Sequence, residues 1–128
     1  ELIKEVVIPE IDSGSIVISD RSAYSSIAYQ GAGRELGIDK IYELNDIALD
    51  GFWPEKVVLL DIDPKISLER QKIIDRIGSS EIEFFERARQ GYLDLAEKYN
   101  DKFLVVDAEK ELSINLNLIC EWLSIGKT

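Results

Sequence analysis

Apolar and polar residues are arranged in blocks that predict helices and strands in alternation along the chain. Apolar residues at helical spacing predict helices over residues 2–13, 39–50, 80–99 and 111–124, and Pro9 is expected to bend or shorten the first of them. β-Branched or continuous apolar runs predict three strands, in SGSIVIS, KVVLLDID and KFLVVDA, and Pro64 can open a helix after the second. Residues 22–31 predict a loop and a short helix that is stopped by the sequence GAG.

Strands that alternate with helices indicate an α/β fold, in which a parallel sheet is covered by helices on both faces. The 128 residues contain no internal repeat and no linker, so we expect one domain. In open parallel sheets, ligands bind beyond the carboxyl ends of the strands. Each predicted strand ends in an acid: Asp20, Asp61 with Asp63, and Asp107. Such acids either cap the following turn, as we expect for Asp107, or border a site, as we expect for Asp20.

The composition of the chain excludes several kinds of site. There is no histidine, which excludes a Ser–His–acid triad and a histidine-ligated metal, and the single cysteine excludes an internal disulfide. The formal net charge of −10 disfavours binding to nucleic acids and to anionic membranes. No apolar run is long enough to span a bilayer and no signal peptide is recognisable, so we expect a cytoplasmic domain.

A group of polar residues directly after the first predicted strand is the first candidate for a binding site. Arg21 could hold a phosphate through two parallel hydrogen bonds, and Asp20 could orient that arginine or hold a hydrated Mg²⁺. Residues at intervals of three or four then share one helical face: Ser22, Ser26, Tyr29 and Gln30. Hydroxyls and an amide suit a sugar and a base edge. The alternative is a capped surface helix with a tyrosine packed inward.

A basic segment between two predicted helices is the second candidate. It contains Arg70, Lys72 and Arg76. A flexible basic loop can close over phosphates and neutralise the charge that develops during phosphoryl transfer. The alternative is a solvated charged turn.

Three blocks of sequence together resemble the thymidylate kinase family: DRS followed by SSIAYQGAGREL, ELNDIALDGFWPEKVVLLDIDP with SLER, and DRIGSSEIEFFERARQGYLDLAEKY. The resemblance covers nearly the whole chain. It implies the fold of P-loop nucleoside monophosphate kinases, a three-layer αβα arrangement around a parallel sheet. It also implies transfer of the γ-phosphoryl group of ATP to dTMP with Mg²⁺, which gives dTDP for dTTP synthesis. Members of the family commonly pair through helices, so a homodimer is also implied.

The resemblance implies roles for four residues of the first candidate group, of which Arg21 contacts the acceptor phosphate. From its position beside Arg21, we predict a catalytic role for Asp20, which could hold Mg²⁺ through water. Ser26 meets the thymine edge. Tyr29 lies against the sugar and disfavours a 2′-hydroxyl, and Gln30 helps to hold the nucleotide.

The resemblance also assigns the basic segment, because residues 70–80 correspond to the family's lid over ATP. Arg70, Lys72 and Arg76 are then the residues that contact ATP. The lid is short, and KII stands where the family is often richer in arginine. Lys72 and Arg76 therefore remain as the candidates for a catalytic role in the lid.

The sequence departs from the family in having no glycine-rich phosphate loop, G-x-x-x-x-G-K-[ST], between a first strand and a first helix. Gly126-Lys127-Thr128 imitates the end of that motif, but its first glycine would fall at Glu121 and no strand leads into it. We therefore expect residues 1–128 to be an incomplete kinase domain, the carboxyl-terminal part of a longer kinase, inactive by itself. Without the strand of the phosphate loop, its neighbours should pair anew, associate with another chain or leave the domain poorly stable.

Two other functions remain open. The sequence DRS resembles the acid-Arg-Ser of deoxynucleoside kinases, although AYQGAGR argues against that family. The missing phosphate loop favours a non-catalytic interaction module derived from the same fold.

Overall fold

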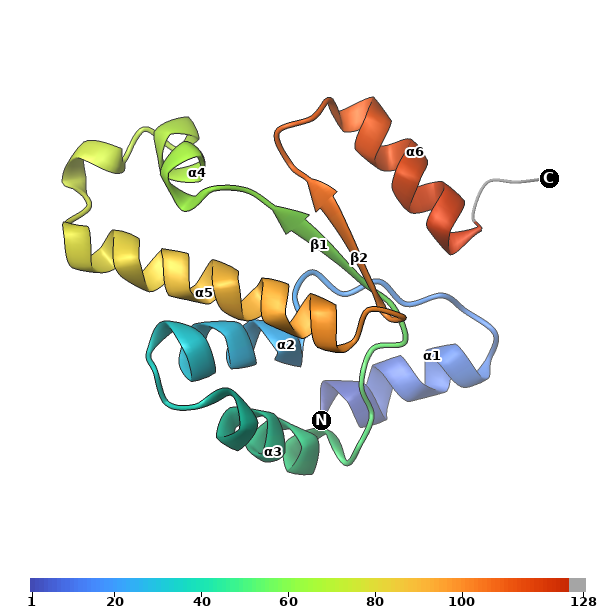
Figure 1. Cartoon of the computed structure of the whole chain (residues 1–128). Helices are drawn as coiled ribbons and strands as arrows, with labels where there is room; N and C mark the ends of the chain where they lie inside the picture. Colours follow the sequence, from blue (N-terminus) through green and yellow to red (C-terminus); the bar gives the residue numbers. More distant parts are fainter. Residues whose placement is uncertain (125–128) are drawn as a thin grey trace.

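The computed structural model describes residues 1–124, and the sequence Gly126-Lys127-Thr128 lies outside them. The described chain consists of helices around a parallel two-stranded sheet (Figure 1). Strands β1 (Val57–Asp61) and β2 (Phe103–Asp107) pair in register along their whole length. Helices α5 (Ser79–Lys98) and α6 (Leu112–Leu123) lie on opposite sides of these strands (Figure 1). The α/β prediction is thus confirmed, with a smaller sheet than expected.

The strand predicted at residues 16–19 is absent, so the prediction of three strands was wrong. These residues pair with no other strand in the described chain, and Ile16 and Ile18 are 76% and 86% exposed. A β-branched run favours a strand locally, but a strand also needs a neighbour to accept and donate its hydrogen bonds. Asp20 and Arg21 consequently follow an unpaired segment rather than a strand of the sheet.

The first predicted helix forms in two parts. A π-helical turn, η1 (Ile3–Val7), runs directly into α1 (Ile8–Asp12). Pro9 lies in the first turn of α1, where its missing N–H is not needed. The backbone remains helical across the junction, because Val7 and Ile8 both have right-handed helical angles, so the chain is not interrupted there. Leu2 and Val6 are exposed, so the rest of the described chain does not cover this segment.

The next helices carry the residues of the first candidate group. Helix α2 (Ala23–Ser26) continues as the π-helical segment η2 (Ile27–Gly33), and α3 (Ile38–Leu49) follows. Helix α3 ends as the sequence indicates, because Asp50 and Gly51 adopt φ angles of 52° and 74°. The remaining helical segments are α4 (Pro64–Arg70), which begins at Pro64 as expected, and the short 3₁₀ turn η3 (Ile74–Arg76).

An aromatic cluster joins these helices to the sheet. Tyr24 is 2% exposed, and its ring centroid lies 4.8 Å from that of Trp53 and 5.1 Å from that of Phe103. Helix α5 packs closely against η2 at Gly91, where a Cβ atom would lie only 2.6 Å from the Cβ atom of Ala32. This contact fixes α5 beside the helix that bears the candidate residues. Among residues 1–124, no helix is both long enough and apolar enough to cross a bilayer.

Candidate functional site

The backbone around Arg21 is held in an unusual conformation. Arg21 has a φ angle of 71°, a left-handed conformation that costs a non-glycine residue about 1–2 kcal/mol. The hydroxyl of Ser19 donates a hydrogen bond to the carbonyl oxygen of Arg21 at 2.6 Å. On the other side, Ser22 Oγ accepts a hydrogen bond from the backbone N–H of Tyr24 at 3.3 Å and so caps α2. These two contacts define the turn that precedes the helix.

Four of the residues singled out in the sequence border one open cavity of about 440 Å³: Arg21, Ser26, Tyr29 and Gln30. They come together because α2 and η2 form one continuous helical segment, on which Ser26, Tyr29 and Gln30 are three or four residues apart. A cavity of this volume lies within the usual range for small-molecule sites. Asp20 is exposed and does not line it.

The same cavity is also bordered by Ser25, which belongs to the same polar stretch, and by two residues that the sequence did not indicate as site residues, Arg34 and Phe84. Phe84 comes from α5 and reaches the cavity because α5 packs along η2. A sequence signal for Arg34 exists, since residues 21–34 begin and end with arginine and contain no acid in a chain that has 25 acids. No comparable signal marks Phe84, whose place depends on tertiary packing.

Aromatic rings and guanidinium groups form a continuous wall along the cavity. The rings of Tyr29 and Phe84 stack with their centroids 6.0 Å apart. The guanidinium carbon of Arg21 lies 5.8 Å from the centre of Tyr29, and that of Arg34 lies 5.6 Å from the centre of Phe84. Within the described residues, neither arginine has a carboxylate partner in an ion pair. Both therefore keep their hydrogen-bond donors available.

The two serines of the cavity are each held from a neighbouring helix. Tyr92 Oη donates a hydrogen bond to Ser25 Oγ at 2.7 Å, and burial raises the pKa of Tyr92. Asn45 Nδ2 donates to Ser26 Oγ at 3.4 Å and to the carbonyl oxygen of Ile41 at 2.8 Å. The hydroxyls thus have defined positions, which favours a specific ligand over a diffuse polar surface.

A magnesium site formed by protein ligands alone is not found among residues 1–124, where no three acidic or sulfur ligands gather. Mg²⁺ usually keeps several waters and binds through one or two carboxylates together with substrate phosphates. The exposed carboxylate of Asp20, next to Arg21, fits a contact of that kind. Asp20 could therefore meet the ion only when a phosphate is bound beside it.

The basic segment lies apart from this cavity. Arg70, Lys72 and Arg76 are exposed, and none of them lines it. Arg70 Nη1 donates to the carbonyl oxygen of Ala108 at 3.4 Å, near the end of β2. Lys72 has a φ angle of 59°, so the chain turns sharply where α4 ends. The structure therefore does not bring the two candidate groups together.

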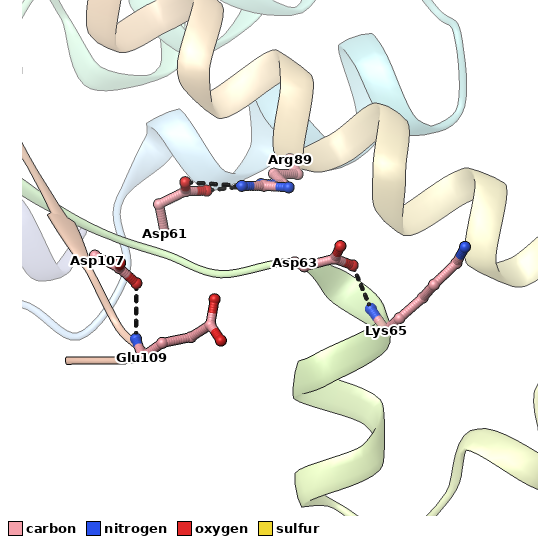
Figure 2. Close-up of polar contacts among 6 residues, drawn as sticks. All are labelled: Asp61, Asp63, Lys65, Arg89, Asp107 and Glu109. Carbon is pink, nitrogen blue, oxygen red and sulfur yellow. Dashed lines mark hydrogen bonds and ion pairs between the residues drawn. The ribbon is translucent and has the colours of Figure 1, made fainter.

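The acids that end β1 and β2 are engaged in contacts within the chain (Figure 2). Asp61 accepts two hydrogen bonds from Arg89, at 2.9 and 3.0 Å, and this contact raises the pKa of Arg89. Asp63 accepts from the backbone N–H of Lys65 and caps α4, while Asp107 accepts from the backbone N–H of residue 109. The expectation that Asp107 caps a turn is thereby confirmed. Asp61 thus connects the end of β1 to α5, whereas Asp63 and Asp107 stabilise the start of α4 and the turn after β2. None of the three lines the open cavity.

Comparison with known proteins identifies the family. The sequence profile described as Thymidylate kinase matches residues 1–119. The curated Thymidylate kinase of Geobacillus sp. (strain WCH70) is 46% identical over 111 residues, which cover 83% of this chain and 53% of that relative. The Thymidylate kinase of Leuconostoc mesenteroides is 42% identical over 114 residues, which cover 85% of this chain and 54% of that relative.

The chain belongs to the thymidylate kinase family. It spans about half the length of the curated relatives it matches. The resemblance noted in the three blocks of sequence is thus confirmed, and the parallel sheet between helices agrees with part of the fold that this family implies.

Proposed function

We propose that this chain supplies the acceptor wall and the lid of a thymidylate kinase. The enzyme transfers the γ-phosphoryl group of ATP to the phosphate of dTMP and releases dTDP and ADP. Family membership supports this reaction. The observation that carries it on this chain is the common cavity of Arg21, Ser26, Tyr29 and Gln30.

Each of these side chains has chemistry that suits one part of dTMP. Arg21 places two parallel hydrogen bonds on the acceptor's phosphoryl oxygens, since no carboxylate of the described chain pairs with it. Ser26, held by Asn45, and Gln30 meet the polar edge of the base and the sugar. Tyr29 presents its ring to the sugar, where an added 2′-hydroxyl would meet an apolar surface.

Phosphoryl transfer depends on positioning and on charge neutralisation more than on covalent help from the protein. Asp20 would hold Mg²⁺ through water, and the ion would supply neutralisation of phosphate charge. Arg70, Lys72 and Arg76 act from the lid, which must close over ATP to bring them near the transferring group. Their exposure and the turn at Lys72 are compatible with such a movement.

The rival functions have less support from specific residues. Ser22, which suggested a deoxynucleoside kinase, has a local task because its hydroxyl caps α2. The other rival is a non-catalytic interaction module derived from the same fold. Such a module has no evident need for the cavity residues named above.

A homodimer is part of the proposal, because α3 has two exposed apolar side chains. Leu44 is 56% exposed and Ile47 is 78% exposed. Burial of such residues between two copies would remove apolar surface from water. Sedimentation of the wild-type chain and of Ile47→Glu tests this pairing. We expect a dimer for the wild type and a monomer for Ile47→Glu, and a monomer for both would contradict the homodimer.

A chimera tests the catalytic proposal directly. The segment of the Geobacillus relative that this chain matches is replaced by the matching segment of this chain, and ADP release is measured with dTMP or thymidine as acceptor. The proposal expects turnover with dTMP. Turnover with thymidine would favour a deoxynucleoside kinase. A folded chimera that is inert with both, beside an active unmodified relative, would favour the non-catalytic module.

A further inference from the structure

Helix α3 runs back along η2 and brings Asn45 beside Ser26 (Figure 1). The two helical segments approach each other closely at Gly31, where a Cβ atom would lie only 3.0 Å from the Cα atom of Ile38. Gly37 allows the turn between them with a φ angle of 101°. The resulting hairpin places the middle of α3 beside the end of α2, where Asn45 Nδ2 lies 3.4 Å from Ser26 Oγ.

A second hydrogen bond fixes the orientation of the Asn45 amide. Its Nδ2 also donates to the carbonyl oxygen of Ile41 at 2.8 Å, one helical turn earlier. A carbonyl oxygen can only accept a hydrogen bond, so the nitrogen of the amide and not its oxygen must face it. The same nitrogen has a second N–H, which is the group within reach of Ser26.

This contact decides what Ser26 can offer to a ligand. An amide N–H cannot accept a hydrogen bond, so the hydroxyl of Ser26 accepts from Asn45 and keeps its own proton for another partner. No acceptor among residues 1–124 takes that proton, and Ser26 borders the open cavity. Two other polar residues of the cavity have no fixed direction. Ser25 contacts another hydroxyl, that of Tyr92, and Gln30 has both donors and an acceptor.

We infer that Asn45 is a positioning residue that makes Ser26 a hydrogen-bond donor toward the ligand, so that the cavity selects a nucleobase with a carbonyl oxygen over one with an amino group at the same place. Asn45 does not itself border the cavity and acts through Ser26.

The choice of a pyrimidine rests on the proposed function. Thymine and cytosine share the carbonyl oxygen at C2, so a donor can tell the two exocyclic groups apart only at C4, where thymine has a carbonyl and cytosine an amino group. An amino group that faces Ser26 would bring two donors together, and neither would have an acceptor in a site from which the ligand displaces water.

The test measures dissociation constants of the 128-residue chain by calorimetry for two pairs of nucleotides. dTMP and 5-methyl-dCMP differ only in the group at C4 and in the proton on N3. dIMP and dAMP differ in the corresponding way among purines. The wild-type chain should bind dTMP about tenfold or more tightly than 5-methyl-dCMP, which is the effect of one mismatched hydrogen-bond donor.

Two substitutions of Asn45 change the contact from outside the cavity. Asn45→Asp places only acceptors beside Ser26 and draws its proton away from the ligand, so the preference for dTMP should disappear or reverse. Asn45→Leu leaves the hydroxyl free to rotate, so the preference should fall by a smaller factor.

The matched control is Asn117→Asp, on the exposed surface of α6, which adds the same charge and should keep the wild-type preference. The ratio of the two dissociation constants is the deciding quantity, because an added charge or a general loss of stability weakens the binding of both nucleotides alike. A cooperative urea transition shows that each variant is folded.

The outcomes separate this inference from the proposed function. If the wild type prefers dTMP and both Asn45 variants keep that preference, the inference is overturned and the proposed acceptor stands. If the wild type binds dIMP more tightly than dAMP and dTMP, and this preference depends on Asn45, the inference stands and the proposed acceptor fails. A wild-type chain that binds none of the four nucleotides, or that does not distinguish the members of either pair, overturns both.

Discussion

Tyr24 should make the stability of this fold depend on pH in the alkaline range. Its side chain is 2% exposed and lies against Trp53. Burial, together with the nearby Tyr42 and Tyr99, raises the pKa of Tyr24 from 10.0 to about 12. Folding therefore favours the neutral phenol, because an ionised phenolate would be enclosed by apolar rings.

The size and the sign of the effect follow from this pKa. The difference between the folded and unfolded pKa values corresponds to roughly 3 kcal/mol in the free energy of unfolding. Because the folded pKa of Tyr24 is the higher one, the contribution is fully present below pH 10 and is lost as the pH rises to about 12. A typical domain is stable by only about 5–15 kcal/mol, so the loss should be readily measured.

The assay compares the wild-type chain with Tyr24→Phe by urea unfolding, followed through tryptophan fluorescence, to which Trp53 beside Tyr24 and Trp122 both contribute. Phenylalanine cannot ionise. Below pH 10 the variant should be less stable by about 1 kcal/mol, because it loses the hydrogen bond from Lys102 Nζ to Tyr24 Oη at 3.4 Å. Above pH 10 the wild type should lose stability relative to the variant. A difference between the two that stays constant up to about pH 12 would refute the role of Tyr24.

Three further substitutions test the packing, the sheet edge and the unpaired segment. Gly91→Ala should lower the free energy of unfolding by about 1–3 kcal/mol, because its Cβ would meet Ala32. Adding Ala32→Gly should recover part of that loss. Equal thermal stability of the wild type and both variants would contradict the close packing of α5 against η2. Asp61→Asn should cost about 1–3 kcal/mol in urea unfolding, because the amide is neutral and keeps only one oxygen to accept from Arg89. Glu43→Gln on exposed surface should change little, and equal effects of the two substitutions would argue against the sheet-edge contact. Ile18→Lys should reduce both self-association and binding of the dye ANS, because Ile18 is an apolar side chain that is 86% exposed. Unchanged sedimentation and dye binding would show that the segment around Ile18 is not an adhesive apolar surface.

The helices and the two paired strands could be predicted because their signals are local. The apolar spacing of residues 39–50 and 80–99 gives α3 and α5 to within about one residue at each end. The continuous apolar run before Asp61 gives β1. The strand predicted at residues 16–19 does not form, because no neighbouring strand in the described chain offers backbone hydrogen-bond partners to Ile16 to Ser19.

The candidate site could be predicted only in part. Arg21, Ser26, Tyr29 and Gln30 are close in sequence, so helical spacing alone brings them to one cavity. Phe84 lies on another helix, and only the packing of α5 at Gly91 brings it there. The sequence likewise could not indicate that Arg70, Lys72 and Arg76 lie apart from the cavity, because lid positions depend on the conformation of the chain.

Arg21 is the residue on which the proposed acceptor site most depends. The most direct test is the dissociation constant of the chain for dTMP, measured by calorimetry before and after Arg21→Gln. Loss of a two-bond contact to a phosphate should raise this constant about 10- to 100-fold and leave the affinity for thymidine unchanged. If the folded variant binds dTMP as tightly as the wild type, Arg21 does not hold the phosphate and the proposed site is wrong.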